Sequence, residues 1–254
     1  MANTDRVDKT MFNDDGHYFG KPADFSDKLT HRRVAVTCEV ENFVGKDLDL
    51  VEIGCGNGAT MILLADKMKS CLGLDINNDH EGEFEQLRTE HGAENCTFQV
   101  CDVEKEKMDR QFDRMISFEV IEHLQDDKNV KEYYNMLKPG GLAVFSVPNK
   151  WWLFETHGAD LPLLPWNRVP FFSWLPRPIH ERYAHARIYT RKRIVNLLKT
   201  AGFEILDTKY ITAPLDVLKD GAVKSFFTNN VFKNDTTTNP FLSTAIFVVA
   251  RKKN

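Results

Sequence analysis

The chain has 254 residues, of which 28% are charged and 11% aromatic, and its formal net charge is -4. This length suits one domain with a lid better than two domains, and the charge argues against a nucleic-acid binder that works through overall basicity. No stretch approaches the roughly 18 consecutive apolar residues of a membrane span, and the polar start lacks a signal-peptide core, so we expect an intracellular protein.

The cysteines support the same expectation. They are odd in number, show no C-x-x-C spacing and lie mostly in apolar, strand-like segments. Their positions are Cys38, Cys55, Cys71, Cys96 and Cys101. We expect free thiols in a reducing compartment, and therefore a cytoplasmic protein, rather than disulfides or zinc ligands.

The first 25 residues are polar and interrupted by glycine and proline, which predicts an N-terminal arm. Residues 26–43 have the apolar spacing of an amphipathic helix, with Ser26 as its N-cap. Three consecutive basic residues lie in this helix: His31, Arg32 and Arg33. They form either a solvated face or a site for a ligand carboxylate, which an arginine fork binds well.

The next apolar run, residues 48–53, predicts a strand buried on both faces. Three glycines follow it at alternate positions: Gly54, Gly56 and Gly58. Glycine allows positive φ and a close ligand approach, and the helix expected over residues 59–68 leaves its first amides free for polar ligand atoms. The spacing differs from the dinucleotide fingerprint G-x-G-x-x-G, which would place the third glycine at position 59.

Two acidic residues follow the next strands. The strand at residues 71–75 ends in Asp75, about 20 residues after the first glycine, where a βαβ unit brings a carboxylate to ribose hydroxyls. A polar helix is expected over residues 81–91, and the strand at 96–100 is then followed by Asp102. Because the carboxyl ends of parallel strands share one edge, both carboxylates are expected at the ligand site.

The run Glu52-Ile53-Gly54-Cys55-Gly56-Asn57-Gly58, together with Asp75, resembles the class I S-adenosylmethionine-dependent methyltransferases of the type 11, quinol-biosynthesis-like group. The resemblance implies S-adenosylmethionine as cofactor and an α/β fold. The fold would be Rossmann-like and doubly wound, with a mostly parallel seven-stranded sheet, an antiparallel last strand and an aromatic-rich lid insert after the fifth strand.

The resemblance also implies roles for single residues. Asp75 would hold the ribose, Asp102 and the Val103 backbone would read the adenine, and a basic residue of the preceding helix would reach the methionine carboxylate. The candidate cofactor-binding residues are Glu52, Gly54, Cys55, Gly56, Gly58, Asp75, Ile76, Asp102, Val103, Glu119 and Arg33.

A fourth strand, residues 112–118, runs into a segment resembling the E-V-x-E-H-L pattern of small-molecule methyltransferases. Glu119, Glu122 and His123 would share one face if this segment were helical. They could then bind a divalent ion, as some quinol O-methyltransferases are thought to do, or cap and orient a helix beside the cofactor. We favour the second role and expect no metal.

The segment 149–187 follows the fifth strand, expected at residues 142–147, and contains all four tryptophans and five prolines. Its aromatic residues either pack it onto the sheet or form a pocket for an apolar or aromatic acceptor, with an edge that could rest on a membrane. Its excess of basic residues could hold an anionic group of the acceptor. We expect a lid and acceptor pocket.

The rest of the chain should complete the sheet. Residues 185–190 resemble an H-x-R-x-[YF]-T run in which Thr190 caps a helix that Gly202 ends. A strand at 203–211, a helix at 216–227, a loop at 228–240 and a last antiparallel strand at 243–250 are expected to follow. Residues 1–254 would then form a single methyltransferase domain.

Methylation of a hydroxyl requires a base, and histidine suits that role at neutral pH. The candidate catalytic residues are His157, His185 and His123, with His180 as a fourth histidine in the segments that face the site. The expected function is methyl transfer to a small-molecule or lipid-like acceptor, with O-methylation favoured. The alternatives are a cofactor-binding but inactive regulatory subunit and an NAD-dependent oxidoreductase.

Overall fold

A computed structural model describes residues 25–159, 169–215, 218–219 and 221–254. The N-terminal arm expected over residues 1–25 lies outside this part of the chain except for Phe25, and so does Trp166 of the insert.

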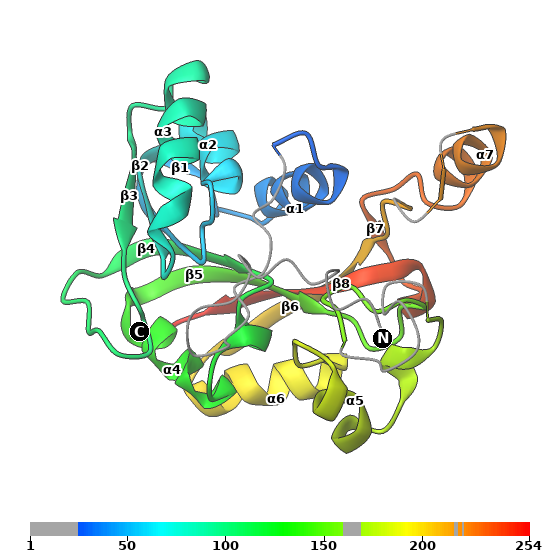
Figure 1. The fold of residues 1–254 in the computed structure, drawn as a ribbon. Coiled ribbons are helices and arrows are strands. Elements are labelled where there is room, and N and C mark those ends of the chain that lie inside the picture. Colours follow the sequence, from blue (N-terminus) through cyan, green and yellow to red (C-terminus); the bar gives the residue numbers. More distant parts are fainter. Residues whose placement is uncertain (1–24, 160–168, 216–217, 220) are drawn as a thin grey trace.

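One sheet of eight strands forms the centre of the molecule, in the order β3-β2-β1-β4-β5-β8-β6-β7 (Figure 1). The strands β1 to β5 pair in parallel, and β8 runs antiparallel to both of its neighbours, β5 and β6. The strands are β1 Gly45–Ile53, β2 Met68–Asp75, β3 Cys96–Val100, β4 Phe112–Phe118, β5 Leu137–Pro148, β6 Glu204–Thr212, β7 Thr236–Thr237 and β8 Ser243–Arg251. The expected Rossmann-like sheet is confirmed, and its eighth strand is the two-residue β7.

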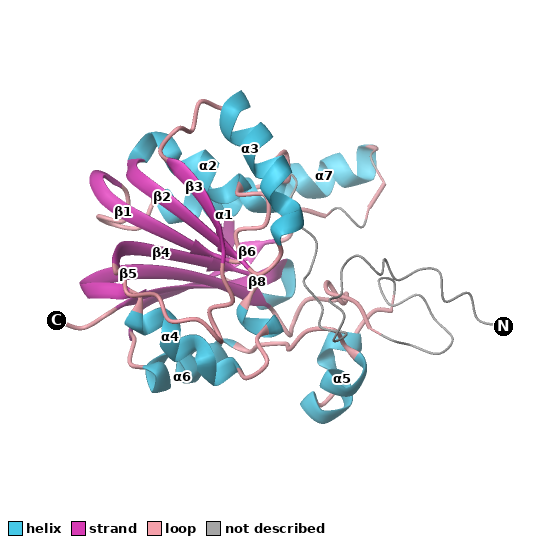
Figure 2. Cartoon of the chain, turned by 60° about the vertical axis from the view of Figure 1, so that its left-hand side comes forward, coloured by secondary structure: helices cyan, strands magenta, loops and turns pink. Residues whose placement is uncertain are grey.

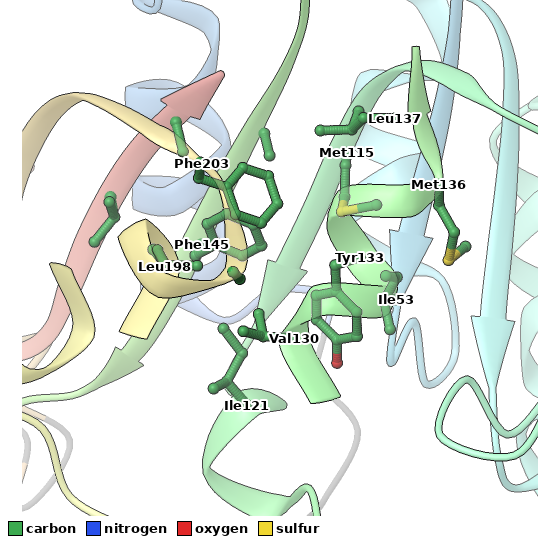
Figure 3. Close-up of a cluster of buried hydrophobic side chains, with 14 of the residues drawn as sticks. Ile53, Met115, Ile121, Val130, Tyr133, Met136, Leu137, Phe145, Leu198 and Phe203 are labelled. Carbon is green, nitrogen blue, oxygen red and sulfur yellow. The ribbon is translucent and has the colours of Figure 1, made fainter. Parts of the chain in front are cut away.

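Helices cover both faces of this sheet (Figure 2). One face packs against α1, α2 and α3, and the other against α4 and α6. The α-helices are α1 Lys28–Cys38, α2 Ala59–Leu64, α3 Glu81–Glu90, α4 Val130–Asn135, α5 Arg177–Tyr183, α6 Arg191–Ala201 and α7 Ala222–Asn230. Figure 3 shows the second face, where Tyr133 of α4 and Leu198 of α6 pack with Met115 and Phe145 of the sheet.

Helix ends follow the capping residues closely. The N-cap of α1 is Asp27 rather than Ser26, because its carboxylate accepts the N–H groups of Leu29 and Thr30 at 3.2 and 3.3 Å. For α6 the prediction is confirmed: the Thr190 hydroxyl accepts the third N–H of the helix, and Gly202 ends it in the left-handed region.

The remaining boundaries differ from expectation by a few residues. The fifth strand already begins at Leu137, five residues before the expected start at residue 142, and α7 begins at Ala222 instead of residue 216. All five cysteines are free, and all but Cys38 are buried. Among the residues that the structure describes, no helix is both long and apolar enough to span a membrane.

Candidate active site

The turn after β1 has three positive-φ glycines, Gly54, Gly56 and Gly58, at 70°, 50° and 74°. The N–H of Gly54 binds the carbonyl of Leu74 at 2.7 Å, which ties the turn to β2. A Cβ on Gly54 would lie 2.3 Å from Val120 Cγ2, and one on Gly58 would lie 2.6 Å from the Phe84 ring. Glycine is therefore required at both positions by side chains that pack against the turn, as well as by φ.

Glu52 supports this turn from below. It is buried, and its carboxylate accepts the N–H of Met61 at 3.2 Å, in the first turn of α2, whose N-cap Gly58 has no side chain to offer. Burial raises the Glu52 pKa to about 8, although hydrogen bonds from Thr60 and Met61 oppose the shift. The predicted contribution of Glu52 to cofactor binding would therefore be indirect, because its carboxylate holds the start of α2 after the glycine turn.

Cys55 would likewise contribute only its backbone. Its side chain is buried toward β2, where its sulfur would lie 2.7 Å from a Cβ on Gly73.

Asp75 and Asp102 lie at the same edge of the sheet, on neighbouring strands. In the β2–β3 pair Asp75 lies opposite Val100, two residues before Asp102, and the Cys101 N–H binds the Asp75 carbonyl at 2.8 Å. The half-buried Asp75 carboxylate accepts the Gly56 N–H at 2.7 Å, so it faces the glycine turn. The Asp102 side chain is 17% exposed and pairs with Lys105 at 2.9 Å.

These residues suit an adenosyl group. Carboxylates accept hydrogen bonds from the hydroxyls of a ribose and from the amino group of an adenine. Asp75 and Asp102 each place a carboxylate at this edge of the sheet. Ile76, directly after Asp75, is 41% exposed, and Val103 is partly buried. Ile76 thus presents apolar side-chain atoms to solvent next to the Asp75 carboxylate.

The basic cluster of α1 has one member at this rim. His31 is exposed, and its ring nitrogen lies 3.0 Å from the Phe25 carbonyl. Arg32 is buried and donates to the carbonyls of Thr212, Ala213 and Phe232. Arg33 pairs with a residue of the cofactor motifs, since its Nη2 lies 2.7 Å from Glu119 Oε1.

Glu119 directly follows β4 and has a φ of 58°, which is unusual for a residue other than glycine. Its Oε1 also accepts the Ser146 hydroxyl at 2.7 Å. The next residues, Ile121–His123, form a single 3-10 turn. Glu119, Glu122 and His123 therefore do not share one face of a helix, because the left-handed residue interrupts the backbone before the turn.

The insert brings His157 onto this segment. Its Nε2 lies 3.3 Å from Glu122 Oε1 and 3.5 Å from Glu119 Oε2, and its ring centroid is 5.2 Å from that of His123. Burial and the Glu119 charge raise the Glu122 pKa to about 7, while His157 lowers it. The His157 pKa is raised, because the carboxylates of Glu122, Glu119 and Glu155 outweigh its burial.

Glu122, His123 and His157 each place one ligand atom within 4.8 Å of the others. This group differs from the one suggested by the sequence, since His157 replaces Glu119. A group of this composition could bind a divalent cation, but buried carboxylates and an imidazole can equally share protons. That the site works without a metal stays a prediction.

The remaining two candidate histidines, His180 and His185, contact residues near His157 in the sequence. His185 is partly buried, and its backbone N–H binds the carbonyl of Gly158 at 3.0 Å. His180 is fully buried, and its Nε2 lies 2.6 Å from Glu155. Sequence reasoning missed Glu155. Its only signal was an acidic residue within a stretch of aromatic residues.

Comparisons with known proteins indicate the family of this chain. Residues 21–208 match a family described as a methyltransferase domain. A Mycolicibacterium smegmatis protein, named as a probable S-adenosylmethionine-dependent methyltransferase, is 30% identical over 186 residues, 71% of this chain and 59% of that protein. The match therefore spans less than two thirds of that relative.

A ubiquinone biosynthesis O-methyltransferase of Pseudomonas fluorescens is 27% identical over 175 residues, covering 65% of this chain and 75% of the enzyme. Among solved structures, an S-adenosylmethionine-dependent methyltransferase from Mesorhizobium loti superposes with a TM-score of 0.61 at 18% identity, over 90% of this chain and all of that one.

Proposed function

The chain belongs to the methyltransferase domain family, and from this premise we propose that it transfers the methyl group of S-adenosylmethionine to a hydroxyl of a small, apolar or lipid-like acceptor. The observation that carries the proposal is the alignment of Asp75, Asp102 and the Arg33–Glu119 pair along the carboxyl edge of β2, β3 and β4. This is the edge at which open α/β sheets bind their ligands.

Each residue has a definite task in this proposal. Asp75 would accept the ribose hydroxyls, Asp102 and the Val103 backbone would bind the adenine, and Arg33 would bind the methionine carboxylate. The bound cofactor supplies an electrophilic methyl group on a positively charged sulfur. The protein's part is to exclude water and to hold the acceptor oxygen about 3–3.5 Å from that methyl in line with the leaving sulfur.

His157 is the proposed base. Its ring nitrogen reaches the carboxylates of Glu119 and Glu122 after β4, and its side chain is 12% exposed. It would remove the proton from the acceptor hydroxyl, and the carboxylates of Glu119 and Glu122 would stabilise the imidazolium that forms. His123 would act beside it, whereas His185 would act through the backbone of the insert.

The acceptor proposal rests on an aromatic cluster at the same edge of the molecule. Trp174 contacts the rings of Phe171, Trp151 and Phe241, with centroids 4.8, 6.4 and 5.4 Å apart. Phe171 is 51% exposed and Phe241 48% exposed, so these two side chains are not buried in the hydrophobic core. It could receive an apolar acceptor or rest on a membrane surface.

Two basic residues of the insert, Lys150 and Arg187, do not favour an anionic acceptor, because backbone carbonyls accept their hydrogen bonds. Lys150 donates to the carbonyls of Ser173 and Leu175, and Arg187 donates to those of residues 122, 124 and 125. Both hold the insert in place. We therefore propose an apolar acceptor rather than an anionic one.

Calorimetry with S-adenosylhomocysteine and with NAD tests the cofactor. We expect binding of the first alone, weakened at least tenfold by Asp75→Asn and unchanged by Asp79→Asn, a matched change at an exposed acid nearby. Preferential binding of NAD would contradict the proposal and favour the oxidoreductase.

Turnover is tested by transfer of labelled methyl into lipid and polar metabolite fractions of a cell extract. We expect label in an apolar acceptor, together with S-adenosylhomocysteine formation. Cofactor binding without any transfer would favour the inactive regulatory subunit, and label confined to polynucleotide would overturn the small-molecule proposal.

A further inference from the structure

Glu155 is a buried carboxylate with donors on several sides. Its Oε1 accepts the N–H groups of Thr156 and His157 at 3.0 and 3.1 Å. Its Oε2 accepts from His180 Nε2 at 2.6 Å and lies 3.4 Å from the Ser173 hydroxyl. We propose that Glu155 is the positioning residue that holds the His157 turn over Glu119 and Glu122. This inference rests on the proposed role of His157.

The turn has need of such an anchor. The stretch from Phe154 to Ala159 forms no helix, and the β contacts it makes with other described residues are isolated bridges, from Phe154 to Pro170 and from Ala159 to Ala184. A side chain on such a loop is held less accurately than one on a helix or strand, unless neighbouring groups fix its backbone. The N–H groups of Thr156 and His157 both donate to the Glu155 carboxylate. The position of that carboxylate therefore fixes the backbone from which the His157 side chain extends.

The anchor is in turn fixed by α5. His180 lies within this helix and is fully buried, and Glu155 is 4% exposed. A carboxylate can only accept, so the hydrogen of the 2.6 Å bond is on His180 Nε2. Burial would raise the Glu155 pKa, but the hydrogen bond and charge of His180 lower it below its ordinary value. An ionised acceptor binds backbone N–H groups more strongly than a neutral one.

Burying the charge of the Glu155 carboxylate costs free energy. A contact with a purely structural role could avoid this cost. A pair of apolar residues could join the turn to α5 equally well, and breaking a buried pair by removing one partner leaves an uncompensated charge. The carboxylate instead combines two tasks, because it joins three segments and aims the backbone of His157 toward the rim.

The kinetic test is a double-mutant cycle between Glu155 and His157. We expect Glu155→Ala to lower kcat about 10- to 100-fold, since a small misplacement of a reacting group has an effect of this size. The KM for S-adenosylmethionine should stay within about twofold, and Glu155→Gln, which keeps an acceptor oxygen, should restore part of the rate. In a His157→Ala background neither change should matter further.

Glu181→Gln is the matched control, because Glu181 is a carboxylate of α5, the helix that also carries His180, and its partners are Arg177 and Arg193. Its kcat should stay near the wild-type value. If the losses from Glu155→Ala and His157→Ala multiply in the double variant, Glu155 does not act through His157 and the inference is overturned.

Amide hydrogen exchange provides a readout that does not depend on turnover, and its measurement on the wild-type protein does not depend on the folding of a variant. In the wild-type protein the Thr156 and His157 amides should exchange slowly, and in Glu155→Ala at least tenfold faster. Fast exchange of both amides in the wild type would refute the anchor. If His157→Ala turned over at the wild-type rate while the Thr156 and His157 amides of the wild-type protein exchanged slowly, the proposed base would be refuted. The role of Glu155 as an anchor would then stand.

Discussion

Arg33 Nη2 and Glu119 Oε1 form an ion pair of 2.7 Å that joins α1 to the residue after β4. The Arg33 side chain is 9% exposed and the Glu119 side chain 20%, so the pair lies partly shielded from solvent at the carboxyl edge. Arg32, its neighbour in the sequence, points elsewhere and donates to carbonyl groups at the end of β6 and after α7. Two adjacent arginines thus serve different purposes.

The first prediction separates these purposes. Arg33→Ala should raise the Kd for S-adenosylhomocysteine at least tenfold in calorimetry, because the proposed carboxylate contact is lost. Arg32→Ala should instead lower the free energy of unfolding by on the order of 3 kcal/mol, since buried carbonyls lose a charged donor. Equal effects of the two changes on binding and on stability would contradict this division.

The second prediction concerns the glycine turn. Gly54→Ala should strongly destabilise the protein and weaken cofactor binding, because its Cβ would lie 2.3 Å from Val120 Cγ2 at a φ of 70°. Gly82→Ala is the matched control. Gly82 lies in α3 with nothing near a new Cβ, so this change should raise the free energy of unfolding by up to about 1 kcal/mol. Thermal unfolding of both variants gives the comparison, and a neutral Gly54→Ala would show that the turn can relax.

The sequence predicted the sheet well because its signals are local. Apolar runs ending in glycine or aspartate place β1, β2 and β3 within a few residues, and parallel pairing then brings Asp75 and Asp102 to one edge. Thr190 and Gly202 likewise act on their own helix.

The approach of the insert to the rim could not be predicted in the same way. His157 meets Glu119 and Glu122 through a turn whose position depends on Glu155 and on α5, far along the chain. The left-handed backbone at Glu119 was equally hidden, because nothing in the residue type requires it. Contacts of this kind depend on tertiary packing rather than on local pattern.

The third prediction is the pH dependence of turnover. A base acts when neutral, and the carboxylates around His157 hold its pKa above the ordinary 6.5, so kcat should fall on the acid side with an apparent pKa above that value. Glu122→Gln removes a charge that stabilises the imidazolium, so the acid limb should move to lower pH. Measurement of kcat between about pH 5.5 and 9 decides this, and an unmoved limb would contradict the role of His157.

The fourth prediction is that metal removal has no effect. A proton shared between Glu122 and His157, whose Oε1 and Nε2 lie 3.3 Å apart, satisfies this cluster without a cation. Dialysis against a chelator should therefore leave kcat unchanged, and added Mg²⁺ or Zn²⁺ should not raise it. Activity that is lost on dialysis and restored by Mg²⁺ or Zn²⁺ would contradict this prediction. If His157→Ala abolished that restoration, Glu122, His123 and His157 would be shown to bind a metal.

The fifth prediction concerns Glu52 and stability. Its pKa is about 8 in the folded protein, against an ordinary value of 4.5. Between these values unfolding releases a proton, so this group lowers the free energy of unfolding as pH rises, by at most about 1.4 kcal/mol per pH unit. Glu52→Gln keeps the shape and an acceptor oxygen for the Met61 N–H but cannot release the proton.

Urea unfolding of both proteins between about pH 5 and 9 tests this dependence. Other titrating groups affect the two proteins alike, so the difference between their free energies of unfolding isolates Glu52. We expect the Gln variant to gain relative to the wild type up to about pH 8, where the folded carboxyl also loses its proton, and the difference to level off above it. A difference that is constant over the whole range would mean that Glu52 is ionised beneath the turn. The support of α2 would then come from a charged carboxylate, and Glu52→Gln would weaken it at every pH.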